Sequence, residues 1–123
     1  MRENTHSVRI IQIIKYNKIM KLITKKIEEK LAAYPLYSQE GRNDDAVIIC
    51  KFFTPDADWT WFVLEGERRG DDYEFYGIVK NSFGTEYGYF LMSDLMQVRG
   101  HLGLPVERDM YFDAKKVRDI IND

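Results

Sequence analysis

Four carboxylates in this sequence occur in two groups whose spacing could bring them together. Glu65 and Glu67 are two residues apart in an aromatic, strand-like segment, and Glu107 and Asp109 have the same spacing further along. Oxygen-rich clusters of this kind hold hard divalent cations and serve phosphoryl transfer. The spacing leaves open a metal-dependent phosphodiester or related hydrolase that uses Mg²⁺ or Mn²⁺, whereas the nearby arginines favour ordinary ion-paired carboxylates.

A histidine in the segment Arg99-Gly100-His101 is placed on a loop after an expected helix. Its side chain exchanges protons near neutral pH, so in the hydrolase alternative His101 is the general acid or base. Arg99 or Arg108 would then stabilise the transition state. No nucleophile elbow and no second core histidine accompany it, which favours a structural role for this loop.

Aromatic side chains are concentrated in the strand-like segments: Trp59, Trp61, Phe75, Tyr76, Tyr87, Tyr89 and Phe90. Aromatic strands stack nucleic-acid bases when Lys and Arg are interleaved with the rings. The charges interleaved here are mainly glutamates. Most of these rings are therefore expected in the core, with a small exposed patch left for a protein partner.

The preferred interpretation is a non-catalytic binding protein that needs no cofactor and whose partner is another protein. Its predicted binding surface consists of Trp59, Trp61, Glu65, Glu67, Arg99, His101, Glu107, Arg108 and Asp109. The candidate catalytic residues of the hydrolase alternative are Glu65, Glu67, His101 and Glu107. The sequence has no Gly-rich phosphate loop and no CxxC, HExxH or GxSxG motif, so nucleotide, zinc and serine-hydrolase chemistry lack motif support.

The chain of 123 residues is long enough for one domain with a hydrophobic core. Its single cysteine, Cys50, lies in the apolar run 46–53 and is expected to be a buried, unpaired thiol. No stretch approaches 18 uninterrupted apolar residues, and no secretory signal is recognisable. These observations predict a cytoplasmic protein that does not interact with membranes.

The charges are unevenly distributed along the chain. Residues 1–33 contain eight Lys and Arg against three Glu, a balance of +5. Residues 34–123 contain ten Lys and Arg against seventeen Asp and Glu, a balance of −7. The basic arm leaves nucleic-acid binding open as a further alternative, but the acidic body argues against contact with a phosphate backbone over most of the surface.

Periodicity and turn signals predict the elements that position these residues. Helices are predicted over 25–33, 94–99 and 114–121, with the N-caps Thr24, Ser93 and Asp113, and with Gly100 as a left-handed terminator. Antiparallel strands are predicted over 46–53, 59–68, 73–80 and 86–90, followed by extended chain over 106–112. Alternation over 59–68 predicts one face with Trp59, Trp61, Val63, Glu65 and Glu67. The expected fold is α+β, an antiparallel sheet of four to five strands with N-terminal, short central and C-terminal helices packed against it.

Several segments together carry a family resemblance. They are KLITKKIEEKLAAYPLYSQEG, AVIICKFFTPDADWTWFVLEGE, FYGIVKN, YGYF, LMQVRG and GLPVERDMYF, in this order. Between Met20 and Phe112 the chain resembles a bacterial family known as domain of unknown function 2958. The resemblance implies an accessory role on a mobile genetic element, related to conjugation or host defence, and implies no activity, cofactor or catalytic residue.

The resemblance begins at Met20, and the sequence before it differs in character. We therefore expect residues 1–19 to be an N-terminal extension that lies upstream of the natural start, and residues 20–123 to form a single α+β domain.

Overall fold

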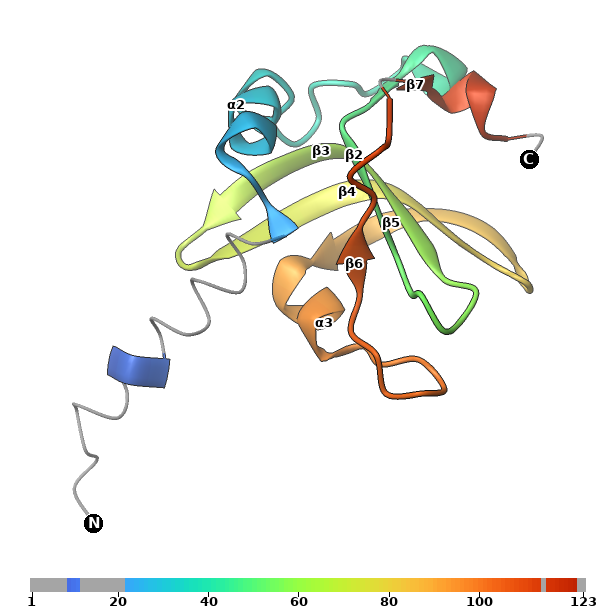
Figure 1. Cartoon of the computed structure of the whole chain (residues 1–123). Coiled ribbons are helices and arrows are strands. Elements are labelled where there is room, and N and C mark those ends of the chain that lie inside the picture. The colour runs from blue at the N-terminus through green and yellow to red at the C-terminus, as the bar shows by residue number, and fades with distance from the viewer. Residues whose placement is uncertain (1–8, 12–21, 114, 122–123) are drawn as a thin grey trace.

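The computed structural model describes residues 9–11, 22–113 and 115–121, and it confirms the α+β class. The helices are α2 (Lys25–Ala33) and α3 (Met92–Gln97), and the 3-10 turns are η1 (Asn43–Asp45) and η2 (Val117–Asp119). The strands are β1 (Val47–Ile48), β2 (Cys50–Phe53), β3 (Thr60–Arg69), β4 (Asp72–Asn81), β5 (Gly84–Leu91), β6 (Glu107–Arg108) and β7 (Lys115–Lys116). Five of them form an antiparallel sheet in the order β5-β4-β3-β2-β6 (Figure 1). The short strand β1 pairs with β7.

The five-stranded sheet is a middle layer with a hydrophobic cluster on each face. On the first face, α2 and α3 pack onto the sheet, where the cluster includes Leu31, Leu95, Trp61, Val63 and Phe75. On the second face, residues from β1, β3, β4 and the C-terminal segment form a smaller cluster: Ala46, Ile48, Phe62, Leu64, Ile78, Val117 and Ile120. Both faces are covered only in part, and the uncovered area of the second face is where the site described below lies.

A β-bulge in β3 changes the face on which its later side chains lie. Val63 is paired with Gly77 and Glu65 with Tyr76, so Leu64 is the extra residue on β3. Beyond it the alternation is shifted by one residue, and Glu65 points to the second face with Tyr76. The prediction that Glu65 and Glu67 share a face with Trp61 and Val63 is therefore wrong.

Helix α2 forms as its local signals predict. The Thr24 hydroxyl oxygen accepts a hydrogen bond from the Ile27 backbone N–H at 3.3 Å, and Ile27 and Leu31 are buried. The helix ends at Ala33, two residues before Pro35, because the residue preceding a proline is disfavoured in the helical region. The predicted strand 46–53 is divided instead into β1 and β2, and only β2 belongs to the large sheet, where it lies between β3 and β6.

The C-terminal helix predicted over 114–121 is not formed. Lys115 and Lys116 pair with β1, and the Val117 backbone N–H donates to the Ala46 carbonyl at 3.0 Å. A 3-10 turn follows and buries Val117 and Ile120. The three-residue spacing of these apolar side chains suits a 3-10 turn as well as an α-helix, and the pairing with β1 decides between them.

The short central helix is present, but its predicted caps are wrong. Helix α3 begins two residues earlier than expected, with Leu91 at the N-cap position, and Ser93 donates its hydroxyl to Asp72 on β4. Among the described glycines, Gly103 rather than Gly100 has the positive φ of the loop after this helix, +78°. Gly100 is needed for another reason, because a Cβ there would overlap the carboxylate of Asp56.

Three other sequence predictions concern the N-terminal extension, membrane spans and Cys50. The predicted extension, residues 1–19, lies outside the described residues apart from 9–11. None of the helices in the described ranges is long and apolar enough to cross a membrane. Cys50 is buried in β2 as predicted, and burial raises the pKa of its thiol to about 12.

Gly77 on β4 offers a test of how closely β4 approaches β3 beside the bulge. A Cβ at Gly77 would overlap the Phe62 carbonyl group, so Gly77→Ala is expected to lower the free energy of unfolding by about 2–3 kcal/mol, as overpacking does. Urea unfolding at constant pH measures the change.

The matched control is Gly88→Ala on β5. Gly88 is the cross-strand partner of Gly77, and a Cβ there meets no atom within 4 Å. It is expected to change stability by less than about 0.5 kcal/mol. Equal losses in the two variants would contradict the assigned overlap with the Phe62 carbonyl, since a Cβ at Gly88 meets no neighbouring atom.

Candidate functional site

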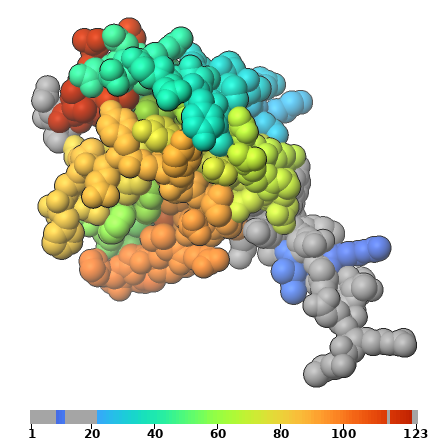
Figure 2. All heavy atoms as spheres, turned by 180° about the vertical axis from the view of Figure 1, so that it is seen from behind, coloured from blue at the N-terminus to red at the C-terminus, as the bar shows by residue number. Residues whose placement is uncertain are grey.

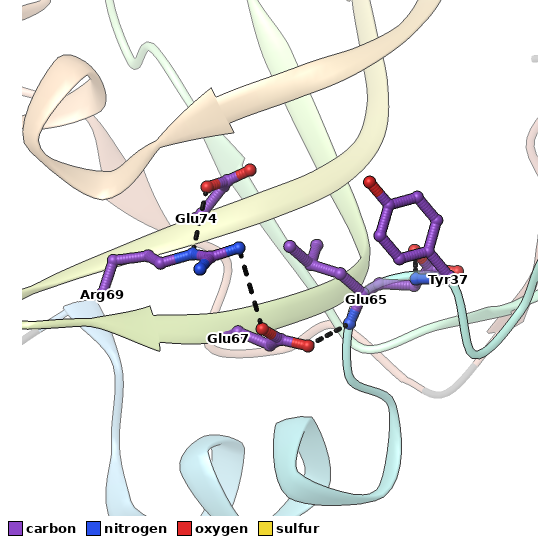
Figure 3. A network of polar contacts seen from close by, with 6 residues as sticks. Tyr37, Glu65, Glu67, Arg69 and Glu74 are labelled. Carbon is purple, nitrogen blue, oxygen red and sulfur yellow. Dashed lines mark hydrogen bonds and ion pairs between the residues drawn. The ribbon is translucent and has the colours of Figure 1, made fainter.

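The loop that follows α2 is fastened to β3 by two carboxylates. Glu65 is 4% exposed; its Oε1 accepts the Tyr37 backbone N–H and its Oε2 accepts that of Gln39, each at 2.8 Å. Oε1 of Glu67 accepts the Leu36 backbone N–H at 3.1 Å (Figure 3). These acids hold the loop in place with charge-assisted hydrogen bonds.

Gln39 completes this attachment, although no pattern in the sequence singles it out. Its side-chain amide, 4% exposed at the residue level, donates to the carbonyl oxygens of Val47 at 2.8 Å and Leu64 at 2.7 Å. Its Oε1 accepts the Val47 backbone N–H at 2.7 Å. The side chain therefore bridges β1 and the bulge of β3 and pairs the carbonyl of the extra residue.

The outer side of Glu67 faces a surface ion-pair network. The Arg69 guanidinium lies between two carboxylates: its Nε is 3.2 Å from Oε2 of Glu74, and its Nη2 is 3.9 Å from Oε2 of Glu67 (Figure 3). The Arg69 side chain is 55% exposed, so these pairs are screened by solvent and contribute little to stability.

The second pair of predicted carboxylates lies elsewhere. Glu107 is paired with Phe53, which is paired with Thr60, five positions before Glu65 on β3. At about 3.3 Å per residue, Glu107 is about 16 Å from the level of Glu65 along the strand. Asp109 forms an ion pair with Lys51 at 3.7 Å. Within the described residues no group of three or more His, Cys, Asp or Glu side chains is arranged to hold a metal ion.

Arg99 and His101 lie on the loop that Asp56 organises. The Arg99 guanidinium donates to the carbonyls of Met96 and Val98, both at 2.8 Å. One Asp56 oxygen accepts the backbone N–H groups of Leu102 and Leu104. His101 is exposed near this carboxylate, at the other end of β3 from Glu65.

The two tryptophans stack on each other at 5.8 Å between ring centroids, but they are differently placed. Trp61 is buried in the first cluster, whereas Trp59 is 41% exposed. The predicted binding surface is thus not continuous: its residues lie along β3 and directly before it, at the edge strand β6, and on the loop after α3.

A different feature unites several of the predicted aromatic residues. A hollow of about 290 Å³ opens on the second face between the loop after α2 and strands β4 and β5. We call it the tyrosine hollow, because Tyr37, Tyr76, Tyr87 and Tyr89 line it. Figure 2 shows this face, with the teal loop lying against the yellow and orange strands.

The tyrosine rings are in mutual contact. Tyr76 packs edge-on against Tyr89 at 4.9 Å and nearly parallel to Tyr87 at 6.2 Å, and Tyr37 lies 6.5 Å from Tyr89. A hydrogen bond between the Tyr37 and Tyr89 side chains, together with partial burial, raises the pKa of Tyr89 to about 12. Partial burial and the nearby Asp44 raise the pKa of Tyr87.

Tyr37 has an unusual backbone conformation. Its φ is +73°, a left-handed value that is rare for aromatic residues. The hydrogen bond from its N–H to Glu65 holds this conformation, and its side chain is 63% exposed at the hollow. Strained residues fixed in this way occur preferentially at binding sites.

The sequence named three of these tyrosines but did not predict the site. Tyr87 and Tyr89 alternate on β5, and Tyr76 lies beside Tyr89 on β4, so their common face was readable from the strand period. The position of Tyr37 depends on the contacts of Glu65 with the loop, which no local pattern reveals.

Together, the α+β sheet, its two hydrophobic clusters and the hollow define a small α+β protein built on an antiparallel sheet. Residues 22–119 match the model of the family described as protein of unknown function (DUF2958), and the chain belongs to that family. Comparison with curated proteins found no match, and comparison with solved structures found none either.

Glu65→Gln tests the attachment of the loop. The amide replaces one acceptor oxygen with a donor that faces a backbone N–H, and a buried donor left unpaired costs about 1–3 kcal/mol. Thermal or urea unfolding should show this loss. Glu67→Gln retains one acceptor at a 39% exposed side chain and is expected to change stability by less than about 0.5 kcal/mol. Equal effects would contradict the assigned role of Glu65.

A divalent-metal titration tests the hydrolase alternative. Mg²⁺ or Mn²⁺ at millimolar concentration is expected to leave the Tm of the wild type and of Glu65→Gln/Glu107→Gln unchanged. The reason is that the Glu65 oxygens already accept backbone N–H groups and that Glu107 is distant. A metal-dependent rise in Tm in the wild type alone would indicate a site that binds the native state.

Proposed function

We propose that this domain is a non-catalytic binding protein whose partner is another protein, bound at the tyrosine hollow. The observation that carries the proposal is a concave surface with three exposed tyrosines: Tyr37, Tyr87 and Tyr89 are 63%, 51% and 53% exposed. Tyrosine is enriched in protein interfaces and among the residues that dominate binding energy. Its large ring and its hydroxyl provide apolar contact and hydrogen bonding together.

Strand β5 supports an extended partner segment. It is eight residues long and forms one edge of the five-stranded sheet, directly beside the hollow that Tyr87 and Tyr89 line. Edge strands offer backbone N–H and C=O groups with which a partner peptide pairs, while side-chain pockets give specificity. A segment added to β5 would place alternate side chains above the hollow.

The charges at the hollow favour a protein over a nucleic acid. None of the residues that line it is Lys, Arg or His, whereas Glu40 and Glu65 are among them. Nucleic-acid sites depend on Lys and Arg side chains that neutralise the phosphates. The nucleic-acid alternative rests on the basic segment 1–33. Of its first 21 residues, only 9–11 are among those that the structure describes.

The contacts of the residues named for the hydrolase alternative also support a binding role. Glu65 and Glu67 are engaged by the loop, and Arg99 is engaged by backbone carbonyls. The resemblance to a family of mobile-element proteins adds the setting that we propose, an accessory role for such an element in the bacterial cytoplasm.

Selection from a random peptide library displayed on phage tests the proposal. Peptides enriched on the wild type are expected to lose at least about tenfold in affinity for Tyr87→Ala/Tyr89→Ala, because removing two interface anchors costs more than about 1.4 kcal/mol. Fluorescence anisotropy of the labelled peptides measures the dissociation constants.

Tyr111→Ala provides the control, since Tyr111 is 92% exposed and lies outside the hollow. It should bind the same peptides as the wild type. Thermal unfolding confirms that the double variant is folded, as expected for half-exposed side chains. Failure to enrich any peptide that depends on Tyr87 and Tyr89 would refute the proposed function.

A further inference from the structure

We propose that the tyrosine hollow receives an arginine side chain of the partner protein. This inference rests on the proposed function and specifies the chemistry of the group that the hollow binds. It follows from three properties of the hollow: the faces of its rings, the sign of the charges around it, and the hydrogen-bonding state of its acids.

The rings provide the first argument. Four tyrosines line one opening of about 290 Å³, and their planes differ by 55° between Tyr37 and Tyr89 and by 66° between Tyr76 and Tyr89. Because these planes are tilted against one another, a group in the hollow can contact ring faces as well as ring edges. The negative face of an aromatic ring attracts Lys, Arg and other organic cations.

The charges provide the second argument. The residues that line the hollow include the acids Glu40 and Glu65 and no basic residue. Asp44 lies close enough to Tyr87 to raise the pKa of its hydroxyl, so its negative charge acts on the hollow as well. A cation gains from this field, whereas an anion or a neutral polar group does not.

The hydrogen bonds distinguish the two acids. Both oxygens of Glu65 accept backbone N–H groups of the loop. Glu65 therefore contributes its negative charge to the hollow, but it is not the main hydrogen-bond acceptor for an occupant. Glu40 is the exposed acid among the residues that line the hollow, so its carboxylate is the one left to accept N–H groups from the occupant. A guanidinium stacks on a ring through its plane while its edge donates to a carboxylate in a two-pronged pair, which an ammonium group cannot do. The combination of rings and carboxylate therefore favours Arg over Lys.

Small probes test the inference directly. Butylguanidinium chloride is titrated into the protein labelled for NMR, and the amide and ring signals of Tyr37, Tyr87 and Tyr89 are followed. Butylammonium and the neutral butylurea are the comparison probes, at equal ionic strength. Butylguanidinium is expected to bind with a millimolar dissociation constant, at least about fivefold more tightly than either comparison probe.

Variants locate the binding. Tyr87→Leu is expected to weaken butylguanidinium binding about fivefold, the factor that one cation–π contact supports, whereas Tyr89→Phe retains the ring and should retain binding. Glu40→Gln should narrow the difference between butylguanidinium and butylammonium, and Tyr111→Leu should change nothing. Equal binding of butylurea or butylammonium to the wild type, or unchanged binding in Tyr87→Leu, would overturn the inference.

The arginine inference can fail while the proposed binding function stands. If the selected peptides depend on Tyr87 and Tyr89 but contain no common arginine, the binding function stands and the arginine inference is refuted. If butylguanidinium binds as expected, arginine-to-citrulline replacement in a selected peptide should lower its affinity at least about tenfold, because it removes the charge and keeps the shape.

Discussion

Leu64, the extra residue of the bulge, has a buried carbonyl group that accepts a hydrogen bond from the side-chain amide of Gln39. The same bulge turns Glu65 to the second face, where its carboxylate accepts two N–H groups of the loop that contains Gln39. Loop and bulge thus satisfy each other's backbone groups. Without this exchange a buried carbonyl and two amides would be left unpaired, and the position of Tyr37 would not be defined.

The hollow is a consequence of that arrangement. Two of its walls come from a rigid sheet, where cross-strand pairing fixes Tyr76, Tyr87 and Tyr89. The remaining ring comes from a loop held by charge-assisted bonds to the same sheet. A surface built in this way is formed before a ligand arrives, so binding costs little conformational entropy at these side chains. Two of the carboxylates that resemble catalytic residues in the sequence, Glu65 and Glu67, are the ones that hold the loop of this surface in place.

The fold was predictable where the decisive contacts are local. Thr24, the apolar stripe of α2 and Pro35 act within a few residues of each other, and α2 forms as expected. The alternation of β4 and β5 is likewise a local property. The conformation of the C-terminal segment was not predictable in this way, because it is decided by pairing with β1, about 70 residues earlier in the chain.

The site was less predictable for the same reason. The bulge at Leu64 has no signature in the sequence, so period-two alternation places Glu65 on the wrong face. Gln39 lies in a polar loop where nothing distinguishes it from its neighbours, although it is almost fully buried. Residue types identified the strand tyrosines as candidates for exposure, but their meeting with Tyr37 depends on contacts between residues 28 positions apart.

Cys50 has a consequence for the environments in which the domain can exist. It is the sole cysteine of the sequence, so no internal disulfide can form, and its burial in β2 keeps the thiol protonated far above neutral pH. Oxidation and disulfide exchange require an accessible thiolate. The fold should therefore be unaffected by the thiol–disulfide balance of its surroundings.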